Sequence, residues 1–161
     1  MVIIMAILGY TLLAVAVFVL DLLIKNHVER TRVEGQEESA CGGRILVRRY
    51  HNKGAFLNAG EHKRELVTVL SLALTLGATV LFLATFTFRG NRMLKIGLAL
   101  LLGGGYSNTY DRMVRKYVVD YVSFPVKNTK IRNIVFNISD FCIMIGALLM
   151  VIGSGSESVK Q

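Results

Sequence analysis

Four long apolar blocks divide this chain, and they constrain its fold more than any other feature. They cover approximately residues 2–24, 66–88, 93–112 and 134–152. A helix of about 20 apolar residues is long enough to cross the hydrocarbon layer of a bilayer. A soluble chain of 161 residues has too little interior to hide four such blocks. The sequence therefore predicts one integral membrane domain over residues 1–161, all-α in class, with four transmembrane helices.

The polar stretch between the first two blocks contains the pattern of a short strand. Residues 44–50 read RILVRRY, an apolar run with charged edges, and glycines stand at 42, 43, 54 and 60. We therefore expect a small β-element, approximately residues 40–60, in the first extramembrane loop. We expect it to lie on the membrane surface.

The net charge of +8 favours anionic lipid headgroups over nucleic acid as partners, because the basic residues lie beside the apolar blocks. Of the 19 Lys and Arg residues, 15 lie in the loops 25–65 and 111–133. Taken alone, the positive-inside rule would place these loops in the cytoplasm. A folded surface element is not a short unstructured loop, so the charge count leaves the orientation open.

The sequence contains no pattern for a metal centre or a serine nucleophile. Cys41 and Cys142 have neither metal-ligand spacing nor a CxxC motif. His27, His51 and His62 all lie in the first loop, without HExxH, and no serine stands in GxSxG. We therefore expect no metal and no organic cofactor.

Asp140 is an ionisable residue inside the fourth apolar block. Such a residue costs about 2.5 to 3.5 kcal/mol on insertion scales, so its presence requires an explanation. Asn137 and Asp140 are three positions apart and would share one face of a helix. This polar face could bind another helix through hydrogen bonds, or it could hold a catalytic carboxylate beside an orienting amide. The segment itself supports both interpretations equally.

A second polar face ends the third apolar block. Asn108, Asp111 and Arg112 have the spacing i, i+3 and i+4, which places them together at the membrane boundary. For Asp111 and Arg112, an interfacial ion pair that anchors the helix is the favoured interpretation.

Asp120 lies in the apolar loop segment 118–122 and has no adjacent cation, so it requires a partner from elsewhere in the fold. Asp120 and Asp140 both lie near one membrane boundary. Two carboxylates in a site of low dielectric constant share a proton and titrate as a unit. The ionised carboxylate can take a proton from water while the neutral one polarises a carbonyl, as in aspartic proteases. The sequence thus indicates a catalytic carboxylate pair.

Five short motifs follow one another along the chain. They are Asp21 with Lys25, Asn52-Lys53-Gly54-Ala55-Phe56, Asn108-Thr109-Tyr110-Asp111-Arg112, Val118-Val119-Asp120-Tyr121 and Phe136-Asn137-Ile138-Ser139-Asp140. Each motif is weak alone. Together, in this order and across nearly the whole chain, they resemble the motifs of the lipoprotein signal peptidases, also called signal peptidase II.

The resemblance implies an intramembrane aspartic endopeptidase that removes the signal peptide from prolipoproteins. Cleavage would occur on the amino side of a diacylglyceryl-modified cysteine, with Asp120 and Asp140 as the catalytic residues. The supporting and substrate-binding residues would be Asn52, Asn108, Asp111, Arg112 and Asn137. The resemblance also implies a protein of the bacterial cytoplasmic membrane, with both termini in the cytoplasm and the active site near the outer leaflet. We expect it to be a monomer that contacts membrane lipids. We follow the family on orientation, against the charge count.

The chain departs from the family pattern at several positions. Ser107 replaces the usual Gly, Ser139 replaces Ala, Leu22 stands where Gln is common, and one Ala is missing before Phe56. The Ser139 hydroxyl could bind the Asp140 carboxylate or the backbone carbonyl four residues earlier. With the acidic segment 34–38, these departures suggest a divergent member.

Two other classes of protein would also tolerate Asp140 in a membrane. A small transporter or proton channel would show inverted repeats or broken helices more often than this chain does. A non-catalytic scaffold would use Asn108, Asn137 and Asp140 only as hydrogen-bonding contacts between helices.

Overall fold

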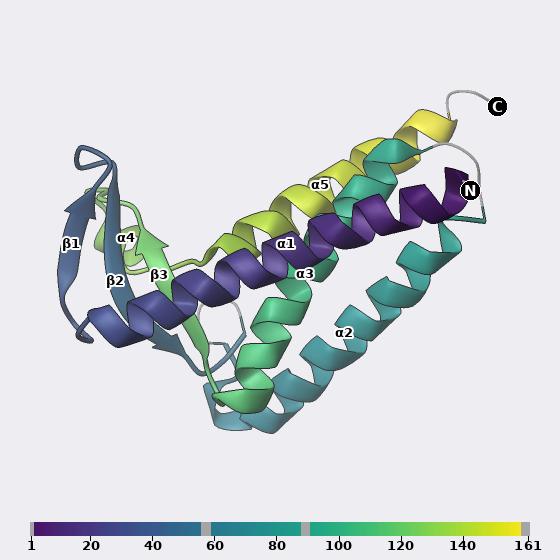
Figure 1. Cartoon of the computed structure of the whole chain (residues 1–161). Coiled ribbons are helices and arrows are strands. Elements are labelled where there is room, and N and C mark those ends of the chain that lie inside the picture. The colour runs from purple at the N-terminus through teal and green to yellow at the C-terminus, as the bar shows by residue number, and fades with distance from the viewer. Residues whose placement is uncertain (1, 56–58, 88–90, 159–161) are drawn as a thin grey trace.

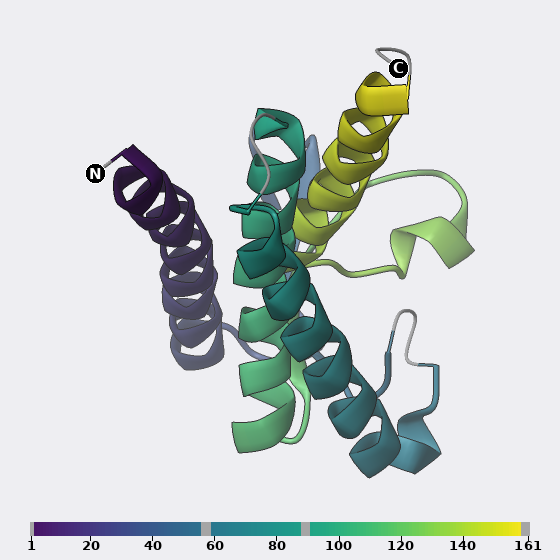
Figure 2. The ribbon, with the colours of Figure 1, turned by 90° about the vertical axis from the view of Figure 1, so that its right-hand side faces the viewer.

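The computed structural model describes residues 2–55, 59–87 and 91–158. Four long helices dominate it: α1 (Val2–Thr31), α2 (Arg64–Ala84), α3 (Arg92–Val114) and α5 (Ile138–Ser158). α3 packs against each of the other three and stands between α1 and α5 (Figure 2). α1 begins and α5 ends at the same end of the helices, and a small sheet lies at the opposite end (Figure 1).

The glycines at 103–105 allow α3 to approach its three neighbours closely. A Cβ atom at Gly103 would lie 2.6 Å from the backbone oxygen of Ala14 in α1. At Gly104 it would lie 2.5 Å from the backbone oxygen of Ser139 in α5, and the third glycine faces α2. Small residues at such contacts are how helices pack in membranes.

The sheet has three antiparallel strands in the order β1 (Glu37–Ala40), β2 (Ile45–Asn52) and β3 (Val118–Ser123). The first two strands confirm a β-element in the first loop, although it begins before residue 40. The third strand was not predicted. The segment 118–122 is not a loop, because it pairs with β2 and is buried between that strand and the helices. Pairing places Asp120 opposite Tyr50.

The first helix is longer than predicted and continues to Thr31 instead of ending at residue 24. Residues 25–31 contain no glycine or proline that would stop it. Val28 is buried and packs with Val119 and Tyr121 of β3. The sheet therefore stabilises this extra length.

The last helix begins at Ile138 rather than at residue 134. The backbone N–H of Phe136 donates to the Val122 oxygen at 2.7 Å, and the Phe136 oxygen accepts from the N–H groups of Tyr121 and Val122 at 2.8 Å. The backbone N–H and oxygen of Phe136 are therefore bonded to β3 and are not available for hydrogen bonds within a helix. Residues 134–137 therefore run beside β3, with a short helix, α4 (Thr129–Arg132), before them.

Among the residues that the structure describes, two helical segments, Ile4–Thr31 and Glu61–Ala84, are long and apolar enough to cross a membrane, and Ile138–Ser154 is a shorter apolar helix. The second segment includes the turn η2 (Glu61–Lys63). Large apolar side chains lie exposed along α1, α2 and α5, among them Leu8, Leu12, Val69, Leu74, Val80, Ile145 and Leu148. α3 lies within the ±2-residue margin of its predicted bounds. α3 is the central helix and buries much of its surface against the other helices. That four helices cross the membrane therefore stays a prediction.

Candidate active site

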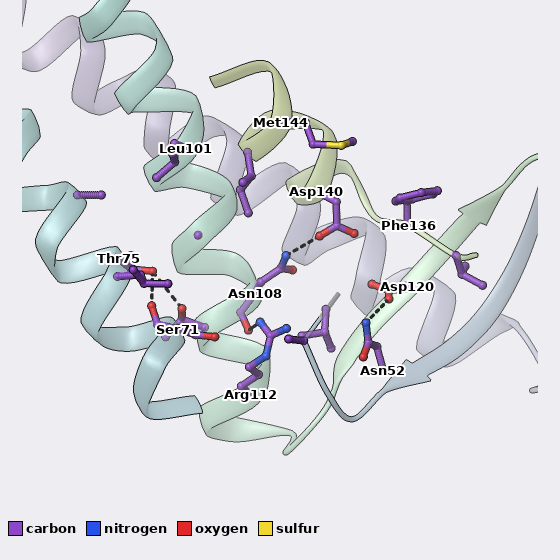
Figure 3. Close-up of a pocket in the computed structure, with 18 of the residues that line it drawn as sticks. Asn52, Ser71, Thr75, Leu101, Asn108, Arg112, Asp120, Phe136, Asp140 and Met144 are labelled. Carbon is purple, nitrogen blue, oxygen red and sulfur yellow. Dashed lines mark hydrogen bonds between the residues drawn. The ribbon is translucent and has the colours of Figure 1, made fainter. Parts of the chain in front are cut away.

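A cavity of about 830 Å³ lies between α2, α3 and α5 and reaches the sheet. Polar side chains gather at one part of its wall: Asn52, Asn108, Arg112, Asp120 and Asp140 (Figure 3). Much of the remaining wall is apolar, including Leu74, Ala78, Leu81, Leu101, Ile143 and Met144. The site therefore combines a polar centre with a long apolar surface.

Asp120 and Asp140 face this one cavity, although β3 carries the first and the first turn of α5 carries the second. Asn137 binds both of them. Its side-chain Nδ2 donates to Asp120 Oδ1 at 2.6 Å, and its backbone N–H donates to Asp140 Oδ2 at 3.0 Å. The two carboxylates thus share a single asparagine.

Asn137 and Asp140 do not share a helix face, as the sequence suggested, because Asn137 precedes α5. Asn137 Oδ1 accepts from the backbone N–H of Asp140 at 2.9 Å, and Asp140 Oδ2 accepts from that of Asn137. This reciprocal pair is a capping box at the helix start. Asp140 is consequently held in the first turn of α5.

Two further amides bind the carboxylates (Figure 3). Asn52 Nδ2 donates to Asp120 Oδ2 at 3.1 Å, and its Oδ1 accepts from the N–H of Gly54 at 3.1 Å. Asn108 Nδ2 donates to Asp140 Oδ1 at 2.9 Å. Each carboxylate therefore accepts hydrogen bonds from two asparagines.

The prediction of an ion pair between Asp111 and Arg112 is wrong. Adjacent helix residues point in different directions, and Asp111 instead lies 3.1 Å from Lys25 Nζ and 3.0 Å from Arg115 Nε. Arg112 lines the cavity and donates to two backbone oxygens. Asp111 is fully buried away from the cavity and contacts the Asp120 segment by accepting from the N–H of Val119.

Ser139 binds neither of the partners that the sequence suggested. Its Oγ donates to Asp21 Oδ2 at 2.5 Å, and Ser107 Oγ donates to the same oxygen at 2.6 Å. Both hydroxyls are buried. The two departures from the family pattern therefore meet at one carboxylate.

Asp120 is 1% exposed, and its pKa is raised to about 8, with this burial as the largest cause. The neighbouring charge of Asp140 raises the pKa as well, whereas the hydrogen bonds from Asn52 and Asn137 lower it. Removal of a carboxylate from water disfavours its charged form. The pair formed by Asp120 and Asp140 therefore holds a proton more tightly than two exposed carboxylates would.

Tyr50 lines the cavity but was not singled out in the sequence. Side chains two positions apart in a strand point to the same face, so Tyr50 could have been found from its spacing to Asn52. Phe56, the end of one motif, lies outside the described residues. Within the described parts of the chain, no cluster of three or more His, Cys, Asp or Glu residues could hold a metal ion.

The family model for Signal peptidase (SPase) II matches residues 13–155. The chain is 30% identical over 154 residues to the lipoprotein signal peptidase of Caldicellulosiruptor bescii, covering 93% of this chain and 95% of that protein. It is 36% identical over 148 residues to that of Mesorhizobium japonicum, covering 88% and 82%. A solved bacterial membrane enzyme, 21% identical, has a similar fold, with a TM-score of 0.78 over 95% of this chain and 91% of its own. Because the family model spans most of the sequence and these relatives match along nearly its full length, this chain belongs to the signal peptidase II family.

Proposed function

We propose that this protein is an intramembrane aspartic endopeptidase that removes the signal peptide from prolipoproteins. It would cut on the amino side of a diacylglyceryl-modified cysteine. The observation that carries the proposal is that Asp120 and Asp140 face one cavity and share Asn137. Family membership supports peptidase activity, and the name of its relatives, lipoprotein signal peptidase, supports the substrate class.

In this mechanism the carboxylate pair carries one proton. The ionised carboxylate takes a proton from a water molecule, and the water oxygen attacks the carbonyl carbon of the scissile peptide. The protonated carboxyl donates a hydrogen bond to the carbonyl oxygen. The carboxyl group that took the proton from water then gives it to the leaving amine as the C–N bond breaks, and the pair again holds one proton. Asn52, Asn108 and Asn137 hold the carboxylate oxygens in place for these transfers.

The apolar part of the cavity suits a lipid-modified substrate. α2 and α5 both line it, and both pack on α3, whereas in the described residues α2 and α5 have no substantial packing against each other. An apolar signal segment can therefore enter sideways from the lipid, with its acyl chains remaining among lipid tails. Arg112, at the polar part of the wall, supplies a cation for substrate oxygens.

A cleavage assay with purified protein in detergent tests the proposal. The protein should cut a precursor that carries the diacylglyceryl group and release a product with an amino-terminal modified cysteine, measured by mass spectrometry. The unmodified precursor is the control and should remain uncut. A chelator should leave the rate unchanged. Equal cleavage of both precursors would contradict the substrate assignment, and inhibition by the chelator would contradict the carboxylate mechanism.

The cleavage rate is expected to fall as the pH rises through about 8. The pKa of Asp120 is raised to about 8, so the pair keeps its proton below that pH and loses it above. Without this proton no acid remains to polarise the carbonyl, and kcat should fall by about tenfold per pH unit. Initial rates between pH 6 and 10, with thermal unfolding measured at each pH, check this. A constant rate over that range would contradict a shared proton.

We also propose that both termini lie in the cytoplasm and that the sheet and the site lie near the outer leaflet. Cys41 is free and exposed in the turn between β1 and β2, whereas Cys142 in α5 is half-buried. A membrane-impermeant thiol reagent should therefore label the protein in intact spheroplasts, and Cys41→Ser should abolish the labelling. Labelling that occurs only after lysis would place the sheet in the cytoplasm.

A further inference from the structure

Behind the proposed active site, Asp21 joins four elements of the fold. Its Oδ2 accepts from Ser107 of α3 at 2.6 Å, from Ser139 of α5 at 2.5 Å and from Lys25 of its own helix at 2.8 Å. Its Oδ1 accepts from the hydroxyl of Tyr121, in β3, at 2.8 Å. Asp21 is fully buried, so these donors replace all of its hydration.

Lys25 is also fully buried and connects Asp21 to the site. Its Nζ lies 2.8 Å from Asn108 Oδ1, 3.1 Å from Ser107 Oγ and 3.1 Å from Asp111 Oδ2. Asp21 and Asp111 provide negative charge on two sides of the ammonium, which offsets the cost of burying it. Lys25 is thus fixed by acceptors from α1 and α3.

The ammonium determines which way the Asn108 amide points. An ammonium group only donates hydrogen bonds, so Asn108 must turn its oxygen toward Lys25. Asn137 Nδ2 donates to the same oxygen at 3.2 Å. The NH₂ group of Asn108 is left to face the opposite way, and there it donates to Asp140 Oδ1.

We propose that Lys25 is a positioning residue for the carboxylate pair: held by Asp21, Asp111 and Ser107, it directs the amide N–H of Asn108 at Asp140. Ser139 acts on Lys25 only through Asp21. Lys25 is not in the cavity wall and acts only through Asn108. In this chain the hydroxyls of Ser107 and Ser139 also bind Asp21 and so help to hold Lys25. The family pattern has Gly and Ala at these two positions. The proposal rests on the proposed function for its effect on rate, but the orientation of the amide can be measured without substrate.

The double variant Asp21→Asn with Lys25→Met is the first test, because it removes both charges of the ion pair within α1, while Asp111 keeps its ion pair with Arg115. We expect kcat to fall by at least about tenfold while KM is unchanged, since a misdirected amide alters the carboxylates and not the apolar groove. We expect Ser107→Ala with Ser139→Ala to shift kcat in the same direction by a smaller factor. Thr79→Val is the matched control, because it removes a hydroxyl between α2 and α3 that binds Tyr106 and does not reach the carboxylates.

The second measurement is the NMR signal of the Asn108 side chain, with asparagine-selective ¹⁵N labelling and Asn108→Asp for assignment. In the unaltered protein the two amide protons should be strongly inequivalent, because one is held on a carboxylate. In both double variants the difference should shrink, and in Thr79→Val it should not. An unchanged Asn108 signal in a folded double variant would overturn the proposal. If the unaltered protein cleaves the precursor, a kcat in the double variant equal to that of the unaltered protein would also overturn the proposal.

If the charge-removing variant does not fold, the double serine variant decides by the same two measurements. If the unaltered protein does not cleave the precursor, the proposed function fails, and the Asn108 signal still decides the positioning role.

Discussion

Replacing Asp120 or Asp140 with Asn is expected to abolish cleavage of the lipid-modified precursor while the helices remain assembled. An amide has nearly the same shape as a carboxyl group, but it can neither take a proton from water nor return one to the leaving amine. Proton transfer by a positioned side chain contributes about 100- to 10,000-fold to a rate, so each variant should lose at least about 100-fold in kcat. The rate of product release in detergent measures this loss.

Glu38→Gln is the matched control for these variants. Glu38 lies exposed on β1, where it pairs with Arg32, and exposed ion pairs contribute little to stability. It should keep full activity. Thermal unfolding of all three variants should show retained structure. A scaffold would instead lose assembly in the Asp140 variant, and a transporter would show no cleavage even in the unaltered protein.

Gly104→Ala is expected to disrupt the contact between α3 and α5 and to lower both stability and cleavage rate. The added methyl carbon would lie 2.5 Å from the Ser139 backbone oxygen, so α3 and α5 would have to separate. Overpacking costs about 1 to 3 kcal/mol and sometimes more, and here the atom that must move is backbone. Because Asp140 follows Ser139, we expect both thermal stability and kcat to fall, as measured by unfolding and cleavage assays.

Gly9→Ala provides the comparison for Gly104→Ala. Gly9 lies in α1, and an added Cβ meets nothing within 4 Å. The same chemical change there should leave stability and rate near those of the unaltered protein. Equal behaviour of the two variants would mean that the close contact between α3 and α5 does not position Asp140.

Helix positions could be predicted from the sequence to the extent that they depend on local composition. The apolar run of α3 predicts its bounds closely, because length and hydrophobicity belong to the segment itself. The ends of α1 and α5 could not be predicted in this way. Val28 is kept helical by packing on β3, and Phe136 is kept out of α5 by hydrogen bonds to the same strand.

The same division applies to the candidate site. Residue types and motif order were sufficient to select Asp120, Asp140 and Asn108, because carboxylates and amides in apolar segments are costly unless they have partners. The partners of these side chains could not be predicted, because they come from distant segments. Asp111, for example, binds Lys25 of α1 rather than its neighbour Arg112.

Sequence alone determined that this chain is an apolar helical protein with acidic residues near one end of its helices, because these are properties of short segments. Only the tertiary structure decided that β3 completes the sheet, that Asn137 caps α5 and binds both carboxylates, and that Ser139 turns to Asp21. Except for the cap, in which Asn137 binds Asp140 three residues later, these contacts join segments that are distant in the chain. Their geometry follows from how closely the helices can pack, and the glycines of α3 set that distance.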